Sequence, residues 1–240
     1  MSREPASHTL ILVTLVIVVA IGGLVAWVIT RSTAEYHPAI RPTNFSSAVT
    51  NPYFSLPPGK KLTYEGPVKN GVERDEFIVL NEKKSIMGVD CVTVRDTVWT
   101  NNQLTEQTLD WYAQAKNGDV WYFGEDTKEY ESGKVTSTAG TWEAGKNGAQ
   151  PGILMKAAPQ VGDTWRQEYL KGVAEDKAQV LGTHETVSVP TDTYQNCVKT
   201  KDWTDLEPNK VENKYYCAGN VALTTTPDGS ERVQLTSISP

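Results

Sequence analysis

Apolar and polar residues alternate one by one along many short segments from residue 60 onward. Leu62 and Tyr64 share one side of such a segment, and Val92, Val94 and Val98 share one side of another. Successive side chains of a strand point to opposite faces, so this pattern predicts an antiparallel sheet with one buried face. The segments are rich in Val, Thr, Tyr, Trp and Phe, which suit a pleated surface.

Turn dipeptides separate these segments, among them Asn70-Gly71, Asn117-Gly118 and Asp228-Gly229. Asn-Gly and Asp-Gly accept the positive φ angles of tight hairpins. We therefore predict a mainly β fold, with one curved antiparallel sheet or half-barrel of hairpins.

One exception to the strand pattern is expected. Two Gly- and Pro-rich stretches, 145–152 and 159–162, flank Ile153, Leu154 and Met155. This region is predicted to be a long loop that crosses an end of the sheet.

A run of twenty uncharged residues, Leu10 to Ile29, precedes the alternating region. At about 1.5 Å per residue, a helix of this length spans the hydrocarbon core of a bilayer, about 30 Å thick. The run is longer than the apolar part of a typical signal peptide, which favours a retained single transmembrane helix over a cleaved signal. Both alternatives place the rest of the chain across the membrane.

The chain is thus expected to have three parts. Residues 1–34 form the membrane anchor or signal segment, residues 35–59 a Pro-rich linker and domain entrance, and residues 60–240 an exported antiparallel β domain. We expect a single-pass protein of the cell membrane with its C-terminal domain outside the cytoplasm. Secretion after signal cleavage is the alternative.

The charge balance argues against one large class of partner. The chain has 23 Lys and Arg residues against 29 Asp and Glu residues, and a net charge of −6. Nucleic-acid binding needs a basic face, so we predict no nucleic-acid partner. The membrane, through the N-terminal helix, is the expected contact, with an amphiphilic or glycan molecule as the possible ligand.

Two of the three cysteines fall on a predicted hairpin formed by residues 193–203 and 211–217. Facing residues of an antiparallel pair have a constant index sum, and pairing Cys197 with Cys217 puts the turn at Glu207, beside Pro208-Asn209. Facing residues lie close enough for a disulfide, and an exported domain favours oxidation. The alternative is that all three thiols are free and buried. Cys91 is expected to be buried and unpaired.

The sequence contains few of the patterns that carry catalysis. It has three histidines, no G-x-S-x-G elbow, no second histidine at zinc-protease spacing after His184, and no glycine-rich phosphate loop. We therefore predict no catalytic residue, no metal site and no cofactor.

Acidic and aromatic residues instead suggest a binding surface. Asp96 lies on the apolar face of its strand, where a carboxylate needs a partner or a function, and acids of the next strand can approach it. Two segments around the Asn117-Gly118 turn add aromatic rings and further acids. The simpler interpretation is that these rings fill the core and that the acids are solvated or ion-paired. The candidate ligand-binding residues are Asp96, Glu106, Asp110, Tyr112, Trp121, Glu125 and Asp126.

Several longer motifs, including 110–114 (DWYAQ), 120–126 (VWYFGED), 148–152 (GAQPG) and 166–169 (RQEY), are similar to those of a family of exported, mostly bacterial proteins of unassigned activity. The resemblance covers roughly residues 51–225. It implies a curved antiparallel half-barrel, by analogy with periplasmic lipoprotein carriers that hold acyl chains in their concave face.

Three functions follow as expectations. The first is a membrane-tethered domain that binds a ligand or an envelope partner without catalysis. The second is a carboxylate-dependent hydrolase acting on envelope glycans, and the third is a structural or assembly protein of the envelope. A hollow concave face separates the first function from the third.

Overall fold

The computed structural model describes residues 36–239. The predicted anchor from Leu10 to Ile29 lies outside this range. Within residues 36–239 there is no helix with the length and apolar character needed to cross a membrane. The described chain is almost entirely β, as the alternating pattern predicts, with one 3-10 turn, η1 (Pro42–Asn44).

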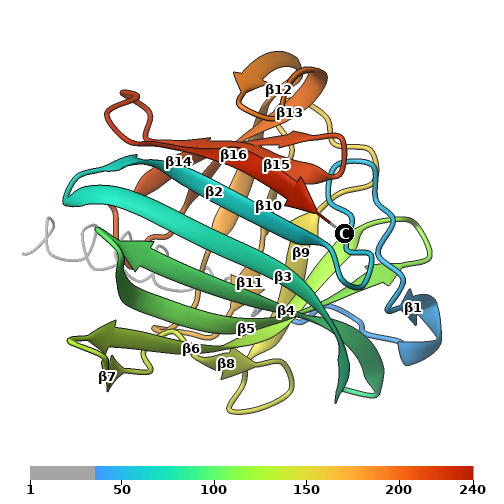
Figure 1. The fold of residues 1–240 in the computed structure, drawn as a ribbon. Helices are drawn as coiled ribbons and strands as arrows, with labels where there is room; N and C mark the ends of the chain where they lie inside the picture. Colours follow the sequence, from blue (N-terminus) through green and yellow to red (C-terminus); the bar gives the residue numbers. More distant parts are fainter. Residues whose placement is uncertain (1–35, 240) are drawn as a thin grey trace, which may run out of the picture. The chain divides into compact units, whose positions relative to one another are not determined.

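The strands pair in antiparallel fashion into one sheet, in the order β10-β12-β13-β14-β15-β16-β2-β3-β4-β5-β6-β9-β11 (Figure 1). Most neighbours in this order are joined by tight turns, in agreement with the turn dipeptides. Three short strands lie off this path. The strands are β1 (Phe45–Ser46), β2 (Lys61–Val68), β3 (Gly71–Ile86), β4 (Val89–Thr100), β5 (Gln103–Ala115), β6 (Val120–Glu131), β7 (Lys134–Ser137), β8 (Trp142–Glu143), β9 (Gln150–Met155), β10 (Thr164–Arg166), β11 (Glu168–Tyr169), β12 (Lys177–Val189), β13 (Asp192–Trp203), β14 (Val211–Cys217), β15 (Asn220–Thr225) and β16 (Arg232–Ser239).

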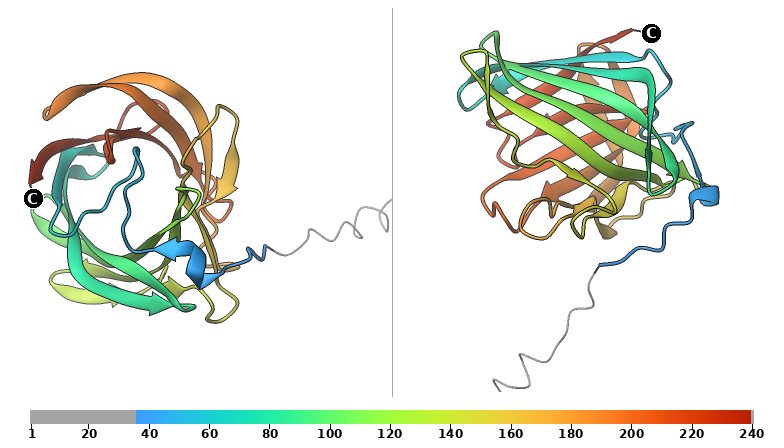
Figure 2. Two further views of the ribbon diagram at one scale, coloured as in Figure 1. Left: turned by 90° about the vertical axis from the view of Figure 1, so that its right-hand side faces the viewer. Right: turned by 90° about the horizontal axis from the view of Figure 1, so that it is seen from below.

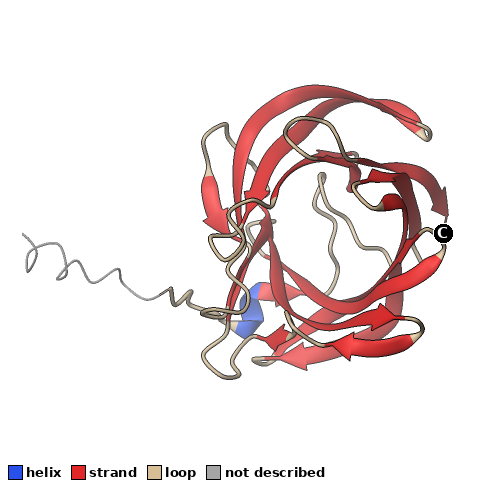
Figure 3. Cartoon of the chain, turned by 90° about the vertical axis from the view of Figure 1, so that its left-hand side faces the viewer, coloured by secondary structure: helices blue, strands red, loops and turns tan. Residues whose placement is uncertain are grey.

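The sheet is so strongly curved that its two edge strands, β10 and β11, are adjacent segments of the chain. Strand β10 pairs with β12, and β11, which pairs with β9, follows β10 after the single residue Gln167. The left view of Figure 2 and Figure 3 show the resulting ring of strands seen along its axis. The curved antiparallel sheet that we predicted is therefore confirmed, and it is nearly closed into a barrel, further than the half-barrel that we gave as its other form.

The expected long loop between residues 145 and 162 is also wrong, because its centre is strand β9. Met155 pairs with Val120, and Gly152 with Tyr122. Gly152 fits here because it has no side chain: a Cβ atom would lie 2.3 Å from the backbone of Gln167. The glycine that suggested a loop is thus what lets the strands approach closely where the barrel closes.

The segment before β2 enters the barrel, where Figure 2 shows it inside the ring of strands. Val49, Phe54 and Leu56 on this segment are buried. The side chain of Asn51 donates hydrogen bonds to the carbonyl oxygens of Gly118 (3.0 Å) and Lys156 (3.2 Å). Residues 49–56, which we grouped with the linker, thus contribute to the core.

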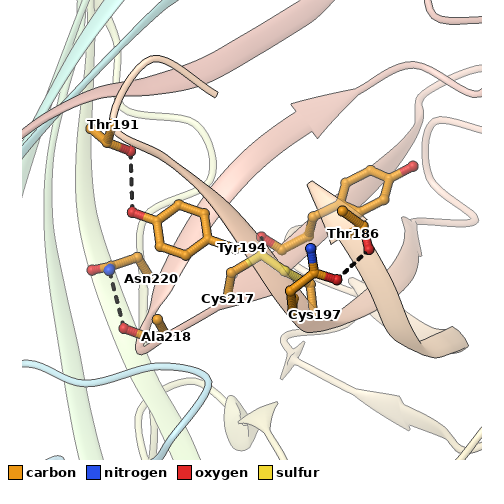
Figure 4. The surroundings of a disulfide bond; sticks show 9 residues. Thr186, Thr191, Tyr194, Cys197, Cys217, Ala218 and Asn220 are labelled. Carbon is orange, nitrogen blue, oxygen red and sulfur yellow. Dashed lines mark hydrogen bonds between the residues drawn. A yellow bond between two sulfur atoms is a disulfide. The ribbon is translucent and has the colours of Figure 1, made fainter. Parts of the chain in front are cut away.

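The β13–β14 hairpin has the predicted register. Val198 faces Tyr216 and Trp203 faces Val211, so the index sum is the one set by the cysteine pair. Cys197 and Cys217 form a disulfide, with Cα atoms 4.6 Å apart (Figure 4). Cys91 is buried and free, also as expected.

The disulfide lies in a small core outside the barrel wall. Val187 and Tyr194, near the tip of the β12–β13 hairpin, pack against Cys197, Cys217 and Leu223. Register shifts along β12 mark bulges that bend this hairpin over the neighbouring strands (Figure 3). The outer face of this part of the sheet is therefore covered by the protein's own hairpin.

An interior cavity as candidate functional site

The barrel is not filled by its own side chains. A cavity of about 320 Å³ runs along its interior. Glu73, Thr226 and Glu231 line one end of the cavity, beside the turns that follow β2 and β15, so the cavity opens at that end. The other lining residues are Phe54, Tyr64, Val68, Asp75, Phe77, Asp96, Tyr112, Leu154, Glu212, Lys214, Tyr216, Val221, Thr224, Thr225 and Val233.

Aromatic rings form the inner end of the cavity. Phe54, from the entering segment, makes edge-to-face contacts with Phe77 (6.2 Å between ring centroids) and Tyr112 (5.5 Å). Tyr112 in turn stacks on Tyr122 at 4.8 Å. These geometries are the favourable ones for aromatic pairs, and they leave a rigid apolar surface facing the cavity.

Two carboxyl groups, Asp75 on β3 and Asp96 on β4, meet in the cavity wall. The register pairs Asp96 with Phe77, two residues from Asp75, so both side chains point inward. The two carboxyls are within hydrogen-bonding reach of each other. Their Oδ1 atoms are shielded from water and receive no hydrogen bond from an N–H or O–H group of any other described residue.

Two carboxylates cannot both be charged at this range without a large cost, so the pair holds a proton. Burial raises the pKa of Asp75 to about 6. Burial, followed by the negative charge of Asp75, raises the pKa of Asp96 well above its usual value. The pair therefore shares a proton at higher pH than an isolated carboxyl would hold one.

The opposite wall carries the one lysine of the lining. Lys214 on β14 lies 3.5 Å from a carboxylate oxygen of Asp202 and 3.7 Å from one of Glu212. Asp202 also accepts hydrogen bonds from Thr200 (2.5 Å) and Gln167 (3.3 Å). Lys214 is therefore already paired with acids of its own wall, and its charge lowers the pKa of Asp96 only against the larger effects of burial and of the neighbouring acids.

A second acidic group lies behind the aromatic end. The hydroxyl of Tyr122 is 2.5 Å from Asp110 Oδ1 and 3.0 Å from Glu125 Oε2. Burial, followed by the charge of Asp110, raises the pKa of Glu125 to about 8. Burial also raises the pKa of Glu106, which accepts a 3.0 Å hydrogen bond from Thr108.

The interior thus brings together five of the seven predicted binding residues, with different access to the cavity. Asp96 and Tyr112 line it directly, whereas Glu106, Asp110 and Glu125 are inward-facing groups that do not reach its surface.

The other two predicted residues, Trp121 and Asp126, lie away from this cavity. Trp121 makes an edge-to-face contact with Phe45 of β1 at 6.0 Å. Asp126 is half-buried and forms an ion pair with Lys128 at 3.2 Å. A register shift at β5–β6 keeps Tyr122 and Glu125 on the interior side although their spacing is odd, and this sends Trp121 and Asp126 to the other side.

Asp75 and Lys214 are the main site residues that we did not predict. In the sequence Glu73-Arg74-Asp75-Glu76, Asp75 resembles one acid of a solvated charged run. Pairing β3 with β4 through the turn at Gly88 would have placed it beside Asp96. That register was obscured by an irregularity between residues 79 and 83.

No cluster of three His, Cys, Asp or Glu residues suited to a metal ion occurs in residues 36–239. The interior chemistry therefore consists of a carboxyl pair, an acidic opening and an aromatic end. Comparisons of the chain with protein-family models, with curated proteins and with solved structures gave no match.

Proposed function

We propose that this protein is a non-catalytic binding domain that takes one small amphiphilic molecule into its barrel and is held at the outer face of a membrane by residues 10–29. The hollow interior is the observation that carries the proposal. Protein interiors are normally packed with few voids larger than a water molecule. A space of 320 Å³ corresponds to about ten water volumes and falls in the size range of small-ligand sites.

The lining supports an amphiphilic ligand. Phe54, Phe77 and Tyr112 offer apolar surface at the inner end, and the carboxyl groups lie between these rings and the opening. A molecule with an apolar body and a polar end would satisfy both regions. A structural or assembly protein without a ligand does not need such a cavity. The cavity therefore argues against that alternative function.

The hydrolase alternative has a less suitable geometry. Glycosidase carboxyl pairs are separated by about 5–10 Å so that a sugar or a water molecule fits between them. Asp75 and Asp96 are in direct contact, whereas Asp110 and Glu125 are joined through Tyr122 behind the cavity. A panel of fluorogenic glycosides tests this alternative: turnover that disappears in Asp96→Asn would favour a hydrolase.

Isothermal titration tests binding directly. The full chain in lipid nanodiscs is titrated with 4-phenylbutylamine and 4-phenylbutan-1-ol, and titrations of empty discs are subtracted. We expect saturable one-to-one binding of at least one probe, and its loss in Thr224→Trp, which fills the cavity from β15. Val135→Trp on the exposed strand β7 is the matched control and should bind normally. Equal binding by both variants would contradict the proposal.

A further inference from the structure

The cavity is strongly acidic for a ligand-sized space. Glu73, Asp75, Asp96, Glu212 and Glu231 line it. Lys214 is the one basic side chain in the lining, and it is already paired with acids of its own wall. Even with one proton shared by the Asp75–Asp96 pair, the lining keeps an excess of negative charge. Such a cavity repels carboxylates and phosphates and favours a cation.

The Asp75–Asp96 pair also lacks a donor beyond the proton that its two carboxyls share. Both side chains face the cavity, and their Oδ1 atoms accept no hydrogen bond from any other described residue. A buried carboxylate without a donor is costly, and protein interiors normally satisfy such groups. A ligand with N–H donors and a positive charge would supply what the wall does not.

The aromatic end matches the same kind of ligand. The rings of Phe54, Phe77 and Tyr112 lie beyond the carboxyl pair and give a surface for an apolar or aromatic body. Aromatic faces also attract cations, so they do not oppose a positive group that rests between them and the acids.

We propose that the ligand is a protonated primary amine with an apolar body, whose ammonium group binds the Asp75–Asp96 pair and whose body lies against Phe54, Phe77 and Tyr112. This assignment rests on the proposed function, because it names the chemical class of the ligand for the same cavity. It excludes fatty acids and phospholipid phosphates as the preferred ligands.

Binding of the cation should be linked to protons. The pair keeps a proton because two negative charges repel, and an ammonium group beside it removes part of that repulsion. Binding near neutral pH should therefore release a fraction of the proton, and it should weaken below pH 6 as Asp75 becomes neutral. The charged and titratable groups that face the pair from the surrounding strands are Tyr64, Glu73, Glu106, Asp110, Tyr112 and Lys214.

The experiment compares three probes of similar size at pH 7.5, using the full chain in nanodiscs. These are 4-phenylbutylamine, the neutral 4-phenylbutan-1-ol and the anionic 4-phenylbutyrate. We expect the amine to bind at least tenfold more tightly than the alcohol, and the anion not to bind. Asp75→Asn should reduce amine affinity toward that of the alcohol, and the double variant Asp75→Asn with Asp96→Asn, which leaves no charge on the pair, should abolish the preference for the amine. Asp90→Asn, on the exposed side of β4, is the matched control and should have no effect.

The outcomes separate the two proposals. If the alcohol binds as tightly as the amine and neither Asn variant changes this, the cavity binds ligands but the amine assignment is wrong. Preferred binding of 4-phenylbutyrate would overturn the assignment in the same way. If no probe binds to the folded protein, both the amine assignment and the proposed binding function fail. Repeating the amine titration in buffers of different ionisation enthalpy should reveal proton release, which a contact outside the cavity would not produce.

Discussion

Replacing Asp75 with Asn should make the barrel more stable at pH 8, although it removes an inward-facing polar group. Burial raises the pKa of this carboxyl from 3.8 to about 6. The folded state therefore binds protons more tightly than the unfolded state, so stability is lost as the pH rises from about 4 to 6. Each pKa unit corresponds to 1.36 kcal/mol. The ionised carboxylate thus costs about 3 kcal/mol above pH 6, and the neutral amide avoids this cost.

Urea denaturation of the full chain, followed by tryptophan fluorescence, measures the effect. At pH 8, Asp75→Asn should increase the free energy of unfolding by about 3 kcal/mol, and at pH 3.5 it should change it little, because wild-type Asp75 is then protonated in the folded state. Asp90→Asn should have no comparable effect at either pH. A variant that is less stable than wild type at pH 8, or one with the same change at both pH values, would show that the ionised Asp75 carboxylate does not destabilise the barrel.

The cost of the ionised Asp75 supports a role in binding. Functional sites often lower the stability of a protein, and a carboxyl pair that destabilises the ligand-free protein at neutral pH and faces a ligand-sized cavity fits that pattern. If Asp75→Asn both stabilises the barrel and weakens amine binding, the two roles of the pair are demonstrated in one variant.

Four further outcomes are expected. Cys197→Ser with Cys217→Ser should cost about 3 kcal/mol of unfolding free energy in urea titrations, because the bond closes a loop of about twenty residues; an unchanged midpoint would contradict this. Phe54→Ala should lower the unfolding free energy by about 3–5 kcal/mol, since its ring is buried within the barrel. Gly152→Ala should cost about 1–3 kcal/mol or more, measured by thermal melting, because its Cβ would meet the Gln167 backbone. Cys91 should resist alkylation by iodoacetamide in the native state at pH 8, because it is buried and its pKa is raised to about 12; rapid labelling would contradict the burial of this side chain.

The strands and the disulfide could be predicted from the sequence because they depend on local signals. Alternation predicts the faces of β2 and β4, and the index sum of Cys197 and Cys217 predicts the β13–β14 register. Both rules need only the two-residue period of a strand and a turn between neighbouring segments.

Closure of the barrel and the identity of the carboxyl pair could not be predicted in this way. Closure depends on Gln167, where the chain passes from pairing with β12 to pairing with β9, and no local pattern marks that change. Gly152 was misleading because a glycine at a close backbone contact resembles a glycine in a loop. Asp75 was missed because its orientation depends on the β3–β4 register, which is shifted by an irregularity.

The most direct test of the account locates a ligand inside the barrel. Methyl-labelled full-length protein in nanodiscs is mixed with 4-phenylbutylamine, and nuclear Overhauser effects are measured between the ligand and the protein. We predict contacts from the phenyl protons to Leu154 and Val221, and none to the exposed Val135 and Val161. Saturable binding whose contacts fall only on exposed methyl groups would contradict the central claim that the hollow interior is the binding site.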